Sequence, residues 1–259
     1  MPTLEQLIFA LFPAALLVVS GAVATLRPPT AWMRSAILHL AAGVVFAVVA
    51  VELIPDLLRD HRPIETAIGF AIGVAAMLGL RAFSHANEKH ERPEPPADPT
   101  KEPQSRPPNT VEPIALPIGM LAGIAIDLVI DGFMIGIGFA AGSKEGRMLA
   151  VALAIELVSL GLAVAAGMSK LGIARARSLV VLIGLSATFL AGAAIGMVLL
   201  SQLSNAWLAG VLSFGAAALL FLVTEELLTE AHEEEETLAL TAMFFAGFLA
   251  FLILGMLGS

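Results

Sequence analysis

The chain of 259 residues has no Cys, no Tyr, only two Trp and few charged side chains, 14% of the total. Without Cys, a disulfide scaffold, a zinc ribbon and thiol chemistry are excluded. Lys and Arg form no cluster and the net charge is −8, which argues against nucleic acids and against a polybasic lipid-binding patch as partners. Apolar residues make up 58% and the mean hydropathy is +0.90, whereas a soluble domain is about 45–50% apolar. This composition indicates an integral membrane protein.

Eight apolar stretches are long enough to cross a bilayer as helices, which takes about 20 residues. Their side chains do not alternate in polarity at every second position, so a β-barrel is excluded. The sequence therefore predicts an all-α integral membrane fold, a single transmembrane domain over 1–259 embedded in the lipid bilayer. The predicted spans are 4–26, 33–58, 64–83, 113–141, 148–168, 178–200, 207–228 and 238–258.

One segment, 84–112, departs from this pattern because it is charged, rich in Pro and almost without apolar residues. Such a composition cannot bury a core, and it predicts a disordered loop between the third and fourth spans. The loops on the same side of the membrane as 84–112, with the adjoining helix ends, carry ten of the Lys and Arg residues, and the other side carries four. The positive-inside rule then predicts a multi-pass protein of the cell membrane, with 84–112 in the cytoplasm and both termini outside.

Two internal repeats relate the spans to one another. Residues 125–132 read AIDLVIDG and 154–161 read AIELVSLG, in consecutive spans that cross the membrane in opposite directions. A weaker repeat relates ELIPD at 52–56 to ELLTE at 226–230. Together they predict a 3+2+3 bundle, in which the first and last three spans are inverted copies that flank the central two. Inverted repeats around a site near the bilayer midplane are typical of secondary transporters.

Three carboxylates are predicted inside the two central spans. Asp127 and Glu156 align in the repeat, and Asp131 lies one turn after Asp127 on the same helix face. Each charge costs roughly 2.5–3.5 kcal/mol at a helix centre, and neither span contains Lys or Arg to neutralise it. Bound protons or a bound cation must therefore do so, and carboxylate oxygens suit a divalent metal.

Three further polar residues are candidates for the path or for support of the site. Ser159 lies one turn from Glu156, where its hydroxyl either faces an ion or bonds back to its own helix. Glu52 and Glu226 lie late in the second and seventh spans, where they would form acidic entrances at the two ends of a cation path.

These residues resemble the ZIP (ZRT/IRT-like) family of divalent metal transporters. The family pattern His-Asn-x-x-Asp/Glu-Gly corresponds to Asp127–Gly132, and His-x-x-x-Glu-Gly corresponds to Glu156–Gly161. The family sequence EELIPEAH is similar to EELLTEAH at Glu225–His232, and ELIPD at Glu52–Asp56 resembles the end of the family's second helix.

The chain departs from the family pattern at several positions. Carboxylates stand in place of both motif His residues, Leu128 replaces the Asn, Leu160 replaces the second motif Glu, and Ala187 replaces a Glu in the sixth span. The resemblance implies eight helices, a long cytoplasmic loop and alternation between helices 1, 4, 5 and 6 and the rest. It carries over one metal position, formed by Asp127, Asp131 and Glu156.

The predicted function is secondary transport of a divalent metal cation, of the zinc, manganese or iron class, toward the cytoplasm. The metal is then a substrate, no cofactor is expected, and no catalytic residues are predicted. A homodimer is a further expectation. Two alternatives stay open: a proton- or cation-coupled transporter of another substrate on the same fold, and a non-transporting membrane protein with a degenerate metal site.

Overall fold

The computed structural model describes residues 3–91, 118–200, 205–232 and 237–257. Within these ranges eight helices are long and apolar enough to cross a membrane, and there is no strand, which confirms the predicted all-α membrane class. Two of the spans are composite, because a short π-helix interrupts each of them. In chain order the elements are α1 (Leu4–Leu26), α2 (Ala31–Val48), η1 (Val49–Leu53), α3 (Ile54–Asp60), α4 (Pro63–Glu91), α5 (Ile118–Ala141), α6 (Ser143–Lys170), α7 (Arg175–Leu200), α8 (Asn205–Phe221), η2 (Leu222–Leu227), α9 (Leu228–Ala231) and α10 (Leu238–Leu257).

Two helices extend well beyond the predicted spans, and the remaining ends differ by only a few residues. α4 continues through 84–91, the first part of the predicted loop, because this stretch contains Ala, Glu and Lys and reaches no Pro before Pro93. The rest of that loop, 92–112, lies outside the described residues. α6 begins at Ser143 and so brings Lys144 and Arg147 into its first turns, where the sequence predicted a loop.

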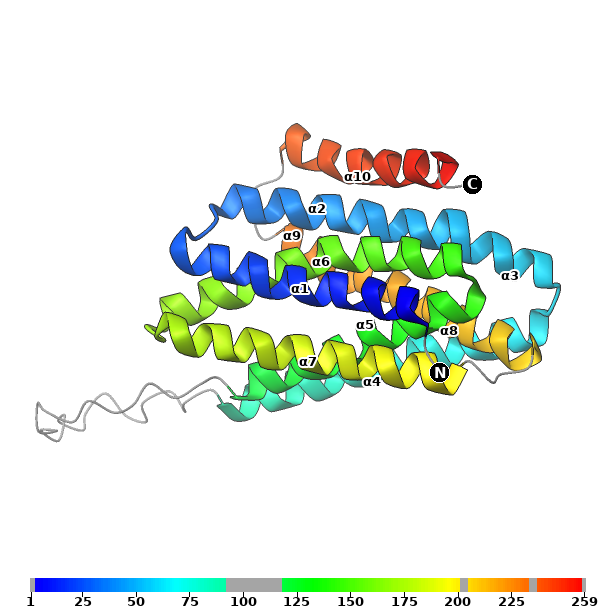
Figure 1. Cartoon of the computed structure of the whole chain (residues 1–259), viewed down its shortest axis with the longest axis horizontal. Helices are drawn as coiled ribbons and strands as arrows, with labels where there is room; N and C mark the ends of the chain where they lie inside the picture. Colours follow the sequence, from blue (N-terminus) through cyan, green and yellow to red (C-terminus); the bar gives the residue numbers. More distant parts are fainter. Residues whose placement is uncertain (1–2, 92–117, 201–204, 233–236, 258–259) are drawn as a thin grey trace, which may run out of the picture.

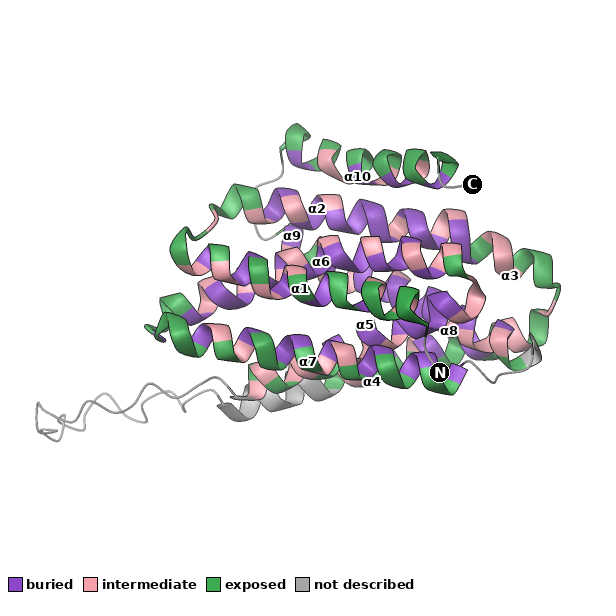
Figure 2. Ribbon diagram, in the orientation of Figure 1, coloured by how far each residue is buried: buried purple, intermediate pink, exposed green. Residues whose placement is uncertain are grey.

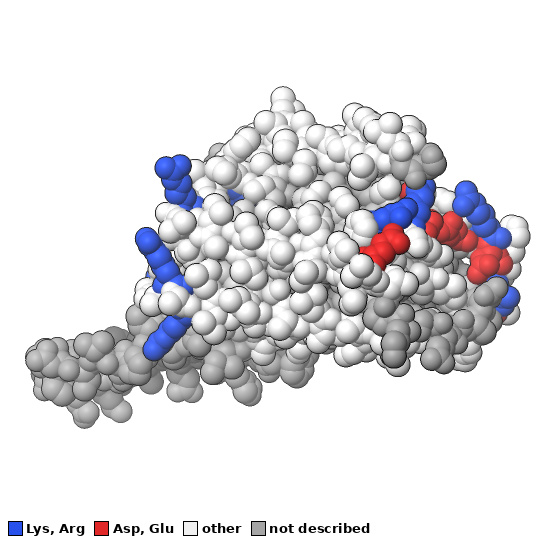
Figure 3. Space-filling model, in the orientation of Figure 1, with Lys and Arg blue, Asp and Glu red and all other residues white. Residues whose placement is uncertain are grey.

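The helices form one elongated bundle, with both termini at the end that also carries α3 and the beginning of α6 (Figure 1). In the face drawn in Figure 3, a broad belt without charged side chains separates the two ends. Lys and Arg stand at one end of that face, and side chains of both signs gather at the end with the termini. This distribution is the one expected when the belt lies in hydrocarbon and the charges lie in water.

We divide the helices into two groups, following the alternation that the family resemblance implies. The first group is α1, α5, α6 and α7, and the second group is made up of α2–η1–α3, α4, α8–η2–α9 and α10. The most extensive contacts are α5 with α7 and α1 with α6 in the first group and α2 with α10 and α4 with α8 in the second, and α2 also packs extensively against α6 across the two groups. Burial is greatest along α2, α6 and α8, while α10 presents most of its surface outward (Figure 2).

Glycine lets the backbones within each group approach closely, as small residues do between membrane helices. A Cβ at Gly132 on α5 would overlap the backbone carbonyl of Phe189 on α7, and a Cβ at Gly161 on α6 would overlap the carbonyl of Leu17 on α1. Gly132 and Gly161 are the last residues of the two repeated segments. The predicted 3+2+3 repeat would exchange α1 with α7, so the paired contacts agree with that prediction without testing it.

The two π-helices lie at the second sequence repeat. η1 contains Glu52 and η2 contains Glu226, the first residues of ELIPD and ELLTE. After η1, Pro55 opens α3 without an N–H to donate, so the regular hydrogen-bond ladder is interrupted there. Single π turns inside α-helices occur frequently at functional sites, because the extra residue redirects a side chain.

Candidate functional site

Three buried polar side chains of the central helices contain an atom without a hydrogen-bond partner. In the described part of the chain, these atoms are Asp131 Oδ2 on α5, and Glu156 Oε2 and Ser159 Oγ on α6. The residues are only 3%, 5% and 2% exposed, respectively. A buried polar atom left unpaired costs about 1–3 kcal/mol, and more when the group is charged. Such atoms indicate a place where a proton or an ion completes the interactions.

Two further carboxylates act on this place through their charge. Asp127, which is half-buried one turn before Asp131, repels both Asp131 and Glu156. Glu226 on η2 also repels both of these groups. Three elements, α5, α6 and η2, therefore supply carboxylates that repel one another. These carboxylates are Asp127, Asp131, Glu156 and Glu226.

This arrangement is not a closed coordination shell. Among the described residues, no three side chains of His, Cys, Asp or Glu lie close enough together to hold a metal ion. Charge repulsion acts over a longer distance than a metal–oxygen bond of about 2–2.6 Å. The predicted ligand set of Asp127, Asp131 and Glu156 therefore stays a prediction, which requires the carboxylates to converge when an ion enters.

Ser159 differs from other hydroxyl groups in these helices. Ser20 on α1 donates to the carbonyl of Leu17 at 3.1 Å, and Thr188 on α7 donates to that of Leu185 at 2.7 Å. The Ser159 hydroxyl makes no such bond to its own helix. The sequence left two interpretations open for Ser159, a hydroxyl that faces an ion and a hydroxyl bonded back to its own helix. The structure does not contain the hydrogen bond that the second interpretation requires.

Glu52 is buried at the end of the bundle that carries the termini. Its side chain is 8% exposed, and its Oε1 lies 3.3 Å from Nζ of Lys144 at the beginning of α6. Both residues line a cavity of about 300 Å³, together with Asp56, Glu145 and Gly255. The sequence singled out Glu52 but missed Lys144, because nothing in the local pattern links residues on two different spans.

At the opposite end, polar contacts join η2 and the residue after α9 to α4 and α2, within the second group. Glu225 forms a salt bridge with Arg81 and so joins η2 to α4. Its neighbour Glu226 instead repels the buried carboxylates Asp131 and Glu156. The rings of His39 and His232 lie edge to face with their centroids 5.3 Å apart. Nδ1 of His39 donates to the carbonyl of Ser35 at 2.9 Å, and Nδ1 of His232 donates to that of Leu228.

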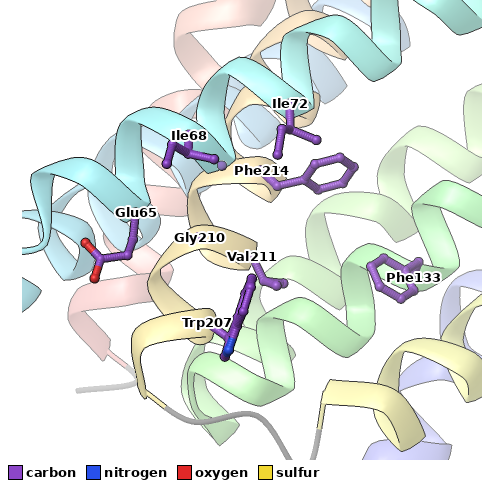
Figure 4. A pocket seen from close by; sticks show the side chains of 9 residues that line it. Glu65, Ile68, Ile72, Phe133, Trp207, Gly210, Val211 and Phe214 are labelled. Atoms are coloured by element: carbon purple, nitrogen blue, oxygen red, sulfur yellow. The ribbon is translucent and has the colours of Figure 1, made fainter.

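A larger cavity, of about 670 Å³, lies between α4, α5 and α8. Its lining is apolar, and the carboxylate of Glu65 points away from the rings of Phe133, Trp207 and Phe214 (Figure 4). Apart from Glu65, these side chains offer no ligand to a cation, and they come from α4 and α8 of the second group and from α5 of the first.

Eight membrane-length helices around buried, uncompensated carboxylates define a membrane protein of the transporter class. The model of the ZIP zinc transporter family matches residues 83–255, so the chain belongs to that family. No curated protein matches the chain. ZIP proteins are metal transporters rather than enzymes, and they carry the metal as a substrate and not as a cofactor, in keeping with the expectations from the sequence.

Proposed function

We propose that this protein carries a divalent metal cation, of the zinc, manganese or iron class, toward the cytoplasm through Asp127, Asp131 and Glu156. The observation that carries the proposal is the set of unpaired buried atoms on Asp131, Glu156 and Ser159. A divalent ion would neutralise two of the carboxylates and accept the orphaned oxygens as ligands. Water would complete the shell, because three carboxylates and one hydroxyl are few ligands for an oxygen-coordinated ion.

The two helix groups support an alternating mechanism. The site residues belong to α5 and α6 of the first group, whereas Glu52 and Glu226 belong to the second group. Movement of the first group along the second would carry the ion from the entrance at Glu52 toward Glu226 and the cytoplasm. The predicted topology, with the termini outside, puts Glu52 at the outer end, and the family resemblance implies movement from there toward the cytoplasm.

The second candidate function is proton- or cation-coupled transport of another substrate. It is favoured by the same unpaired atoms, because a proton on Asp131 or Glu156 also relieves the charge. Proteoliposomes tested separately with Zn²⁺, Mn²⁺, Fe²⁺, Co²⁺ and Cd²⁺ distinguish the two. Flux that depends on a metal gradient supports the proposed function, and flux that follows only a pH gradient supports the alternative. If the purified protein binds none of these divalent ions and the proteoliposomes show no flux, the remaining alternative, a non-transporting membrane protein with a degenerate metal site, would be favoured.

The topology has a direct test, because the chain contains no native Cys. A Cys introduced at Ser105 is expected to react with a membrane-impermeant maleimide only after the cells are opened. Labelling in intact cells would place the loop outside and reverse the proposed direction. Size measurement of the purified protein in detergent tests the predicted homodimer in the same preparation.

Selectivity tests the role of Asp127. Imidazole favours zinc over manganese more strongly than a carboxylate does. The Asp127→His variant is therefore expected to raise zinc binding relative to manganese by about tenfold. Competition binding on purified protein measures the ratio, with Asp60→His at the exposed end of α3 as control. A ratio that stays the same or falls would mean that Asp127 does not touch the metal.

A further inference from the structure

The salt bridge between Lys144 and Glu52 joins helices of different groups, whereas two other salt bridges of the bundle join helices of the same group. Arg147, one turn further along α6, pairs with Glu5 of α1 at 2.8 Å, and both helices belong to the first group. Arg81 and Glu225 pair α4 with η2, within the second group. Lys144 on α6 and Glu52 on η1 instead connect the first group with the second.

The burial of the two partners is unequal. Glu52 is almost fully enclosed, while about a third of the Lys144 side chain is exposed. Removing the cation from a buried carboxylate is destabilising, so replacement of Lys144 by another cation at Glu52 is favoured over its simple departure. Lys has a flexible stem, and its ammonium can leave a buried partner for water. Lys144 is thus the mobile member of the pair.

The pair also occupies the position that an entering ion would reach first. It lines the cavity of about 300 Å³ between η1, α3, the beginning of α6 and the end of α10. Two of the elements that line this cavity, α3 and the beginning of α6, stand at the end of the bundle with both termini (Figure 1), and the predicted topology assigns that end to the outside. Asp56, Arg59 and Glu145 line the same cavity, and because Arg59 pairs with Asp56 at 3.1 Å, Glu145 is the lining carboxylate that adds negative charge around the pair.

We infer that the Lys144–Glu52 salt bridge is an outer gate, in which Lys144 occupies Glu52 until an arriving divalent cation displaces it. The inference rests on the proposed transport function. While Lys144 is bound, the salt bridge adds to the packing of α2 against α6 and resists movement of the first group along the second at this end. When a divalent ion takes over the charge of Glu52, the constraint between the groups is released. The gate then opens only when substrate is present.

Accessibility of the cavity provides the test, on the Cys-free chain. Gly255 lines the cavity, and a Cβ built there would lie 3.5 Å from Glu52 Oε1, an ordinary contact. In a Gly255→Cys background, reaction with an impermeant maleimide added from outside reports opening. Lys144→Met is expected to raise the labelling rate about tenfold, since a buried charge pair is lost. Glu52→Gln breaks the same pair without leaving a buried charge, and it is expected to give the same increase.

Two control variants distinguish opening of the gate from a general destabilisation of the bundle, which would also raise the labelling rate. Arg147→Met removes a cation from the same helix but not from between the groups, and its labelling rate should match that of the Gly255→Cys parent. Lys144→Arg should keep labelling slow, because the pair is retained. Mn²⁺, which binds thiolate more weakly than Zn²⁺ does, should accelerate labelling of the parent and leave Lys144→Met unchanged.

The outcomes distinguish failure of the gate from failure of the transport proposal. Labelling that stays slow in both Lys144→Met and Glu52→Gln, with normal metal flux, would overturn the gate and leave the transport function intact. Fast labelling in these variants without any divalent flux in the parent would overturn the transport function. If Mn²⁺ does not change the labelling rate of the Gly255→Cys parent, although that protein transports Mn²⁺, displacement of Lys144 by the ion would be overturned.

Discussion

The double variant Asp127→Asn, Glu156→Gln is expected to lose divalent metal flux by about 100-fold or more while it remains folded. Two of the three proposed ligands become neutral amides, and loss of even the supporting residues of a metal site typically costs 10–100-fold. Folding should survive because a neutral amide is cheaper to bury than an uncompensated charge. Flux into proteoliposomes and the melting temperature of the purified protein measure the two properties.

The control for this variant is Asp60→Asn, which neutralises an exposed carboxylate at the end of α3. It should transport as the unaltered protein does. A second readout is the rise in melting temperature on addition of Mn²⁺, because a ligand that binds only the folded state stabilises it. The rise should disappear in the double variant. Unaltered flux in the double variant would remove these residues from the site.

The second large effect concerns stability. Gly132→Ala and Gly161→Ala are each expected to destabilise the bundle by about 1–3 kcal/mol or more, because an added methyl group has nowhere to go. At Gly132 it would meet the backbone of α7, and at Gly161 that of α1. Backbone cannot rotate aside as a side chain can, so the helices must separate. Thermal denaturation of the purified variants measures the loss.

Gly167→Ala on α6 and Gly184→Ala on α7 are matched controls, because nothing lies within 4 Å of the Cβ at either position. There the same substitution should be neutral or should stabilise the helix by up to about 1 kcal/mol. Equal melting temperatures for Gly132→Ala and Gly184→Ala would contradict the close contact between α5 and α7.

The spans were predictable because a bilayer sets one dominant requirement, about 20 apolar residues, and each stretch meets it without help from its neighbours. The buried carboxylates were predictable for a related reason. Asp131 and Glu156 are conspicuous because the predicted spans 113–141 and 148–168 contain no Lys or Arg, and both carboxylates are buried. The orientation of the Ser159 hydroxyl could not be predicted, because the same sequence is compatible with a bond to its own helix and with a hydroxyl that points away from it.

Features that depend on packing between distant segments escaped prediction. η1 and η2 insert an extra residue into a helical turn, and hydrophobic periodicity does not report a single irregular turn. Lys144 reaches Glu52, and His39 meets His232, across different spans. The third span was predicted at 64–83, close to Pro63–Ala82 in the structure, but the helix continues to Glu91, into the predicted loop. A helix of polar residues can continue past the bilayer, where hydropathy no longer signals it.

The contrast between the two kinds of helix contact has a mechanical consequence. Where backbone meets backbone, as between α5 and α7 at Gly132, no change of rotamer can absorb sliding, so the two helices must move as one rigid body. Between α5 and α8, by contrast, Phe133 faces Trp207 and Phe214 across a cavity of about 670 Å³ (Figure 4). Shear of one helix past another needs free volume and side chains that can repack. Repacking between α5 and α8 is therefore expected to require less backbone displacement than sliding between α5 and α7, whereas α2 and α6 pack closely where the two groups meet again.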